Sequence, residues 1–235
     1  MINFSYINGN SLNILDFGCG YGVNTIKLLK SGHRLTSVDI NPDCGPFIIK
    51  DLQKDSFDNF KFICLKNDIR HFDFDVKFDV ILCTETLEHI SDYEQTISLF
   101  KKSIKNNGLL IISVPTEFTE KLFVLMDCKW LDESRHINIF NVKLLNQKIA
   151  EQGFTLMSSD KKSSEWFIYW FFLKIFRVKH EMGIPVACNK FQQILIKISN
   201  QFIKIIVMLK PVNKFFDELL PKSIVLYFKY DRNDS

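Results

Sequence analysis

Residues 14 to 22 read Ile-Leu-Asp-Phe-Gly-Cys-Gly-Tyr-Gly, and this stretch decides the fold. A short apolar run contains one acid, Asp16, and then passes into three glycines at alternate positions, Gly18, Gly20 and Gly22. Glycine lets the backbone turn tightly and approach a ligand, and the free amides at the start of a following helix favour a negative group. The stretch therefore predicts a strand, a ligand-binding loop and a helix, in that order.

On both sides of this loop, short apolar runs alternate with longer amphipathic stretches as far as about residue 160. The pattern predicts strands at Asn13–Phe17, Leu35–Asp39, Lys61–Leu65, Phe78–Cys83, Leu109–Val114, Phe154–Ser158 and Ser223–Tyr230. It predicts helices at Val23–Lys30, Phe47–Lys54, Tyr93–Lys105 and Val142–Gln152, with Asn107 and Gly108 ending the third of them. Such alternation is typical of the α/β class, here with a doubly wound, mostly parallel seven-stranded sheet.

Residues 164–221 interrupt this alternation. Two strongly apolar stretches, Trp166–Val178 and Phe191–Leu209, replace the strand pattern, and the second repeats its apolar residues at helical spacing. We therefore expect one domain built from residues 1–163 and 222–235, with a helical insertion before the last strand. The insertion is expected to serve as a lid, as part of the substrate site or as an interface.

The composition limits the class of protein. The 235 residues are 46% hydrophobic and 24% charged with a net charge of +3, which excludes a disordered chain and makes nucleic acid an unexpected partner. Residues 160–235 nevertheless hold 13 basic and 7 acidic residues. The longest apolar run, Trp166–Leu173, is too short to span a bilayer. Together with widely spaced cysteines and no secretory signal, this predicts a cytoplasmic protein, with peripheral contact of residues 165–210 to the inner membrane face or a homodimer as further expectations.

A second acid stands where a nucleoside site needs one. Asp39 closes the second predicted strand, 21 positions after Gly18, where an acid accepts hydrogen bonds from ribose hydroxyls. The nicotinamide pattern G-x-G-x-x-G would place its third glycine at position 23, which is Val23. The spacing thus predicts a nucleoside cofactor and disfavours an NAD-dependent oxidoreductase.

The motifs resemble those of the class I S-adenosylmethionine-dependent methyltransferases, including the small-molecule O-methyltransferases of quinone precursors. The matching segments are ILDFGCGYG at 14–22, TSVDI at 36–40, KNDIR at 66–70, FDVILCTETLEHI at 78–90 and NNGLLIISVP at 106–115. The resemblance implies the Rossmann-like methyltransferase fold and S-adenosylmethionine as the cofactor. It implies cofactor contacts at Asp16, Gly18, Cys19, Gly20, Tyr21, Gly22, Asp39, Ile40, Asp68, Ile69, Cys83 and Thr84.

The catalytic residues of a methyltransferase form a weaker sequence pattern than its cofactor-binding residues. Transfer of a methyl group from a sulfonium mainly requires in-line positioning and, for an oxygen or nitrogen acceptor, removal of one proton. His89 follows the fourth predicted strand and His136 follows the fifth, so both are candidate bases. Either histidine could equally cap a helix or form a buried hydrogen bond. Glu85 and Glu88 could assist them, although Glu88 is better interpreted as a residue on a polar face.

The remaining histidines, His33, His71 and His180, are predicted to lie at the surface. No set of acids and amides has the density that a hard cation needs, so no metal site is expected. The sequence therefore predicts an S-adenosylmethionine-dependent methyltransferase that acts on oxygen in a small-molecule, glycan or lipid-linked acceptor. A non-catalytic cofactor-binding module for regulation or assembly stays open, and an NAD-dependent oxidoreductase is less favoured.

Overall fold

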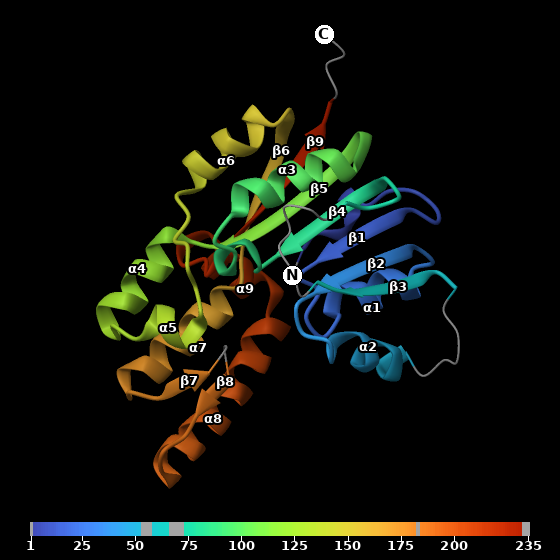
Figure 1. Ribbon diagram of the computed structural model, residues 1–235. Helices are drawn as coiled ribbons and strands as arrows, with labels where there is room; N and C mark the ends of the chain where they lie inside the picture. The colour runs from blue at the N-terminus through green and yellow to red at the C-terminus, as the bar shows by residue number, and fades with distance from the viewer. Residues whose placement is uncertain (1, 53–57, 66–72, 182–183, 232–235) are drawn as a thin grey trace.

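The structure is a computed structural model that describes residues 2–52, 58–65, 73–181 and 184–231 (Figure 1). Seven strands form one sheet in the order β3-β2-β1-β4-β5-β9-β6. The strands are β1 Asn13–Phe17, β2 Arg34–Asp39, β3 Phe60–Cys64, β4 Phe78–Thr84, β5 Ile104–Pro115, β6 Phe154–Lys162 and β9 Ser223–Tyr230. Neighbours from β3 to β5 pair in parallel, and β9 runs antiparallel to both β5 and β6. The predicted doubly wound, mostly parallel sheet is confirmed.

Helices cover both faces of this sheet (Figure 1). They are α1 Val23–Lys30, α2 Cys44–Leu52, α3 Tyr93–Ser103, α4 Glu117–Met126, α5 Trp130–Ser134, α6 Val142–Glu151, α7 Ser164–Ile175, α8 Lys190–Met208 and α9 Lys210–Leu219. Two single 3₁₀ turns, η1 Phe4–Tyr6 and η3 Leu87–His89, and a hairpin of β7 Lys179–Glu181 and β8 Ile184–Val186 complete the described elements. The bounds of β1, α1 and β9 match the sequence-based expectation residue for residue.

The sheet separates two apolar clusters because successive side chains of a strand point to opposite faces. In β1, Leu15 and Phe17 join the cluster that α3 and α6 cover, which includes Phe100. Ile14 joins the opposite cluster with Ile48 of α2. Strands buried on both faces read as continuous apolar runs, which is why the sequence identified them.

One predicted helix end is wrong. Asn107 and Gly108 do not end a helix, because α3 already ends at Ser103 and the chain enters β5 at once. Ile104 pairs with Phe78 at the start of β4, and this sheet pairing overrides the helical pattern of the next residues. Asn107, with φ of 59°, instead forms an irregularity within β5.

Between β6 and β9 the chain forms α7, the β7–β8 hairpin, α8 and α9, which lie to one side of the sheet together with α4 and α5 (Figure 1). This segment has an apolar cluster of its own. This cluster, which we call the insertion cluster, consists of Phe123, Trp130, Phe167, Tyr169, Trp170, Leu173, Val178, Leu195 and Ile203. Because Phe123 and Trp130 come from α4 and α5, the cluster joins the insertion to the segment that follows β5.

Two histidines predicted at the surface are buried. His180 lies in the insertion cluster, with its ring centroid 4.4 Å from that of Trp130 and 4.8 Å from that of Trp170. His33 is buried after α1. The expectation was wrong because a polar side chain inside an apolar cluster has no periodic signal. His71 lies outside the described residues.

No helix in the described part of the chain combines the length and the apolar character that a membrane crossing requires.

The shared cluster predicts that the insertion unfolds together with the sheet. Leu173→Ala should lower the free energy of unfolding by about 2–5 kcal/mol, because Leu173 is fully buried in this cluster. Leu125→Ala, the same change at an exposed position of α4, should alter it by less than about 0.5 kcal/mol. Chemical denaturation monitored by tryptophan fluorescence and by circular dichroism checks this. Two separate transitions in the wild type would contradict the joint core.

Candidate active site

The glycine loop is fastened to the neighbouring strand by hydrogen bonds. The amides of Gly18 and Cys19 donate to the carbonyl of Val38 at 2.8 and 3.0 Å, and the amide of Gly20 donates to Oδ2 of Asp39 at 2.8 Å. These bonds join the carboxyl ends of β1 and β2, which meet at one edge of a parallel sheet. The loop and Asp39 therefore form one preorganised surface.

The three glycines of the loop differ in what surrounds them. Gly18 and Gly22 have φ of 74° and 81°, and a Cβ on either would lie about 2.3–2.4 Å from side-chain atoms of Thr86 or Ile48. Gly20 has φ of 50°, and a Cβ there would have nothing within 4 Å. Gly18 and Gly22 are thus required by packing, whereas Gly20 borders open space in which a ligand could approach the backbone.

Apolar side chains around this open space face the solvent. Tyr21 and Phe47 are exposed and contact each other edge to face at 4.8 Å, and Ile40, directly after Asp39, is 78% exposed. Exposed apolar groups that border a polar loop are typical of a ligand-binding surface. Tyr21 and Ile40, both predicted as cofactor contacts, are therefore accessible to a ligand.

Asp16 lies beneath the loop and is almost fully buried. Its Oδ2 accepts a hydrogen bond of 2.6 Å from the hydroxyl of Thr25, while Oδ1 is buried and has no hydrogen-bond partner. Burial raises the pKa of Asp16 to about 6. A buried carboxylate oxygen that lacks a partner is a suitable acceptor for an ammonium group of a ligand.

The other predicted cofactor residues differ in their surroundings. Cys19 and Cys83 are buried, and burial raises the pKa of both thiols above the ordinary value, so both are expected to be unreactive. Thr84 ends β4, and its hydroxyl accepts a hydrogen bond of 3.1 Å from Asn24. The predicted contacts Asp68 and Ile69 lie outside the described residues.

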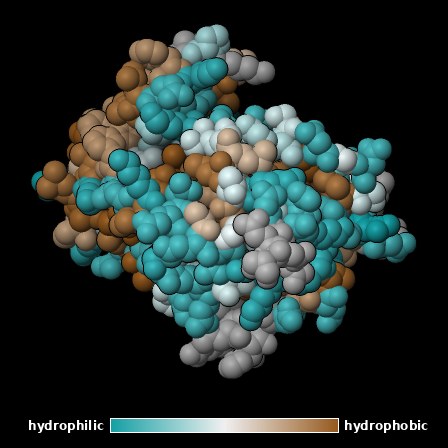
Figure 2. Space-filling view, turned by 90° about the horizontal axis from the view of Figure 1, so that it is seen from above, coloured by the Kyte–Doolittle hydropathy of each residue, from teal (hydrophilic) through white to brown (hydrophobic). Residues whose placement is uncertain are grey.

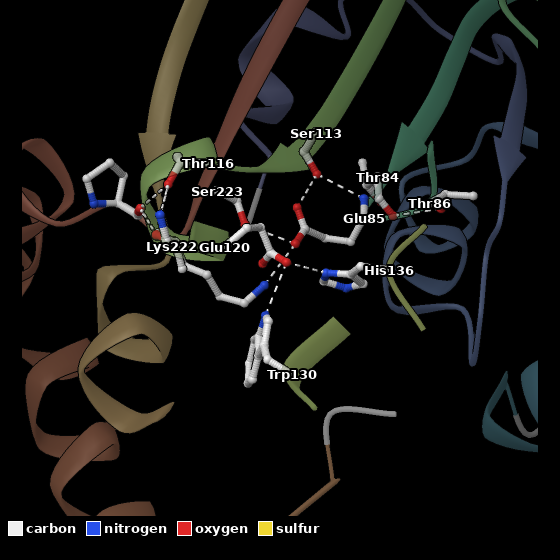
Figure 3. Close-up of polar contacts among 12 residues, drawn as sticks. Thr84, Glu85, Thr86, Ser113, Thr116, Glu120, Trp130, His136, Lys222 and Ser223 are labelled. Atoms are coloured by element: carbon white, nitrogen blue, oxygen red, sulfur yellow. Dashed lines mark hydrogen bonds and ion pairs between the residues drawn. The ribbon is translucent and has the colours of Figure 1, made fainter. Parts of the chain in front are cut away.

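Glu85 joins the ends of three strands beside this loop (Figure 3). Its backbone has φ of 50°, a conformation that costs free energy for a residue other than glycine and recurs at functional sites. Its carboxylate accepts hydrogen bonds from the hydroxyls of Ser113 and Ser223, both at 2.9 Å, and lies 3.1 Å from Nζ of Lys222. Although burial raises the pKa of Glu85, Lys222 and these hydrogen bonds hold it below its ordinary value.

Two bonds fix Lys222 in this place. The amide of Thr116 donates to the carbonyl of Lys222 at 2.8 Å, and the hydroxyl of Thr116 donates to the carbonyl of Pro221 at 3.1 Å (Figure 3). Thr116 also caps α4, since its side chain accepts from the amide of Thr119. The end of the insertion is therefore attached to the start of α4, and the cation of Lys222 is directed toward Glu85.

His136 is held by a buried acid. Its Nδ1 lies 2.8 Å from Oε2 of Glu120, and the same oxygen accepts a hydrogen bond of 3.1 Å from the indole of Trp130 (Figure 3). A carboxylate partner means that Nδ1 carries the proton, which leaves Nε2 as the basic nitrogen. This geometry suits a general base.

His89 faces His136, with ring centroids 4.9 Å apart. Its Nδ1 lies 2.9 Å from the carbonyl of Arg135, so Nδ1 is the donor and Nε2 is again free to accept. Loss of hydration lowers the pKa of His89, and the neighbouring His136 acts in the same direction. The structure thus brings together the two histidines that were predicted from segments 47 positions apart.

Glu88 is not the polar-face residue that the sequence favoured. Its side chain is buried, its Oε2 has no hydrogen-bond partner, and burial together with the negative charge of Glu85 raises its pKa well above the ordinary value. Ligand atoms of Glu88, His89 and His136 lie within 4.8 Å of one another, and they form the one group of this kind found among the described residues. These three could hold a metal ion, whereas the sequence predicted no metal site.

The sequence did not predict the residues that hold Glu85 and His136 in place. Lys222 and Ser223 reach Glu85 from positions 137 and 138 residues away. Glu120 reaches His136 from α4, and Trp130 of α5 donates to the same carboxylate of Glu120. None of these positions belongs to a local motif, so no spacing in the sequence could have identified them.

The difference between the glycines predicts unequal losses of stability for two matched variants. Gly18→Ala should lower the free energy of unfolding by about 2–4 kcal/mol, because the new methyl group meets Thr86 and the backbone is left-handed. Gly20→Ala should lower it by only about 1 kcal/mol, because the new methyl group meets no atom and only the cost of a left-handed backbone remains. Thermal and urea unfolding of both variants checks this. Equal destabilisation would contradict the distinction between packed and open positions.

Comparison with known proteins identifies the family of the chain. The family model described as a methyltransferase domain matches residues 3–159. The ubiquinone biosynthesis O-methyltransferase of Rickettsia akari is 32% identical over 119 residues, which cover 49% of this chain and 45% of the relative. The chain spans about half the length of the curated relatives it matches.

Solved structures share the fold. The N-methyltransferase NodS from Bradyrhizobium japonicum, bound to S-adenosyl-L-homocysteine, aligns with a TM-score of 0.56 at 15% identity, over 97% of this chain and 81% of its own. The [4+2]-cyclase SpnF aligns with a TM-score of 0.61 at 13% identity, over 96% and 77%. Such distant likeness establishes the fold alone. With the family match over residues 3–159 and the glycine loop joined to Asp39, the chain belongs to the class I S-adenosylmethionine-dependent methyltransferases.

Proposed function

We propose that the protein transfers the methyl group of S-adenosylmethionine to a hydroxyl oxygen of a small-molecule acceptor. The observation that carries the proposal is the Glu120–His136 pair (Figure 3), which leaves Nε2 of His136 free to accept a proton beside the ring of His89. The name of the Rickettsia relatives, O-methyltransferase, supports oxygen as the accepting atom.

The chain's own groups fit this cofactor. Asp39 uses its two oxygens to hold the amides of Gly20 and Asn41, and each oxygen has a second lone pair for a ribose hydroxyl. We assign Oδ1 of Asp16, which is buried and has no hydrogen-bond partner, as the acceptor for the cofactor ammonium, and Ile40 offers an apolar surface to the adenine. Asp68 and Ile69 keep their proposed adenine contact from the sequence.

The bound cofactor supplies an electrophilic methyl group on a sulfonium. In our proposal, Nε2 of His136 would accept the proton of the acceptor hydroxyl as the oxygen bonds to the methyl carbon, and the methyl–sulfur bond would break to leave S-adenosylhomocysteine. Glu120 then stabilises the imidazolium that forms, while its bond to Trp130 fixes the direction of its carboxylate. His89, whose free Nε2 lies beside the same ring, is the second candidate for this step.

Two observations bear on the identity of the acceptor. The relatives' name supports a small molecule, and the apolar insertion next to α4 and α5 is consistent with a bulky, glycan-bearing or lipid-linked one. We place the reaction in the cytoplasm, where the acceptor would reach the site from the insertion side. A homodimer, also expected from the sequence, has no bearing on this mechanism.

The proposal is tested by measuring methyl transfer directly. The fold alone does not establish this activity, because a protein named as a cyclase shares it. The purified chain is incubated with S-adenosylmethionine labelled in the methyl group and with a panel of phenolic, glycan and polyprenyl-linked hydroxyl compounds. Label that appears in an O-methyl ether, at one molecule of S-adenosylhomocysteine per methyl group, supports the proposal. Tight cofactor binding without transfer to any extracted metabolite would favour the non-catalytic binding module.

Cofactor affinity should depend on pH through Asp16. The pKa of this carboxyl is about 6 in the free protein, and only the ionised form attracts the ammonium of the ligand. The affinity for S-adenosylhomocysteine should be constant above pH 7 and should fall toward pH 5, by at most about tenfold per pH unit below 6. Calorimetric titration across this range measures it. In Asp16→Asn the affinity should be lower and independent of pH, and an unchanged pH profile would refute the assigned contact.

Substitution of His136 should lower turnover without lowering the affinity for the cofactor. His136→Ala should lower kcat by about 10²–10⁴-fold with cofactor affinity unchanged, because a general base acts only in the transfer step. Glu120→Gln should lower kcat as well, since it removes the charge that stabilises the imidazolium. A chelator should leave the wild-type kcat unaltered. Activity lost to the chelator and restored by a divalent cation would instead assign Glu88, His89 and His136 as metal ligands.

A further inference from the structure

We propose that the outer face of α8 docks on the surface of an anionic lipid bilayer. The face is defined by Phe191, Ile194, Ile198, Phe202 and Ile205, which we call the outer stripe. This inference concerns where the protein binds and does not depend on the reaction proposed above.

The outer stripe is one continuous row along the helix. Its members follow one another at intervals of three or four residues, so they share one side of α8, and each is 52–59% exposed. Among the residues of α8 whose side chains the structure describes, Gln192, Leu195, Ser199 and Ile203 are buried, and Ile196 packs partly buried against the same cluster. The helix therefore packs one side against the core, while a second row that contains apolar residues alone faces the solvent, which a helix that only covers a core does not require.

The stripe continues onto α7 through aromatic contacts. Phe191 lies 5.8 Å from Phe176, and Phe176 lies 5.2 Å from Phe172, between ring centroids. Phe172 and Phe176 are also exposed. Figure 2, seen from above Figure 1, shows further apolar surface on the left, the side of α4 in Figure 1, beside a mostly hydrophilic centre, whereas α8 lies at the bottom of Figure 1 and faces away from that view. A contiguous exposed apolar surface on two helices marks an interaction site.

The charges beside the stripe identify the partner. The charged residues of α8 are Lys190, Lys197 and Lys204, all exposed, and the helix contains no aspartate or glutamate. Lys190 precedes Ile194 by four positions and Lys197 follows it by three, so both border the stripe. Lysine stems can extend along an apolar surface and place their ammonium groups among lipid phosphates. An apolar stripe edged only by lysines is typical of a helix that lies in an anionic membrane interface.

Two alternatives fit the observations less well. Burial across the bilayer does not suit α8, because three lysines interrupt its 19 residues and no helix in the described ranges qualifies as a span. A second copy seated on the stripe would find no carboxylate on α8 to pair with the lysines. A bilayer rich in anionic lipid complements both the apolar row and its charge.

Sedimentation of the full chain with lipid vesicles tests the proposal. The vesicles contain phosphatidylcholine with 30% phosphatidylglycerol or phosphatidylcholine alone. The wild type should sediment with the anionic vesicles, and high salt should weaken the binding. The double variant Ile198→Gln, Phe202→Gln should bind at least tenfold more weakly, because both side chains leave the apolar phase without a change of charge. The matched control Asn200→Gln, on the same helix but off the stripe, should bind as the wild type does.

Three results would overturn the proposal. The wild type could fail to sediment with anionic vesicles, or the double variant could bind them as tightly as the wild type. The third result is a wild-type dimer in light scattering that the double variant converts to a monomer, with no vesicle binding by either. That outcome would make the outer stripe an interface between two copies of the chain. Since the substituted residues are exposed, the circular dichroism spectra of all variants should match, which confirms that they fold.

Discussion

The hydrogen bond from the Gly20 amide to the Asp39 carboxylate is the interaction on which the site depends. It joins the loop after β1 to the end of β2, and it forms only because the left-handed backbone at Gly18 and Gly22 lets the loop turn back. The loop is therefore shaped before any ligand arrives. The space next to Gly20 and the unpartnered oxygen of Asp16 are consequences of that shape.

A second set of contacts connects the insertion with the proposed base. Trp130 packs in the insertion cluster against Trp170 and His180, and its indole also bonds to Glu120, which holds His136. Lys222, directly after the insertion, pairs with Glu85 on the other side of the site. The elements that bind the acceptor in our proposal and the group that removes its proton thus share one packed unit. If the outer stripe lies on a membrane, that unit stands directly above the lipid surface.

The sequence was informative wherever a feature is local. Buried parallel strands are continuous apolar runs, and the cofactor loop is a motif of nine residues, so the sheet and the positions of Asp16 and Asp39 could be predicted. The sequence could not predict contacts between residues that are far apart in the chain. The partners of Glu85, the burial of Glu88 and the placement of His180 between two tryptophans depend on tertiary packing, and the β7–β8 hairpin is too short for a periodic pattern.

The most direct test of the central claim is a calorimetric titration of the wild-type chain with S-adenosylhomocysteine and, separately, with NAD. The site as described accepts an ammonium group beside Asp16 and a ribose beside Asp39, in a loop with Val23 where the nicotinamide pattern needs glycine. We expect S-adenosylhomocysteine to bind at one site per chain and NAD to produce no heat. Binding of NAD, or no binding of S-adenosylhomocysteine by the folded protein, would contradict it.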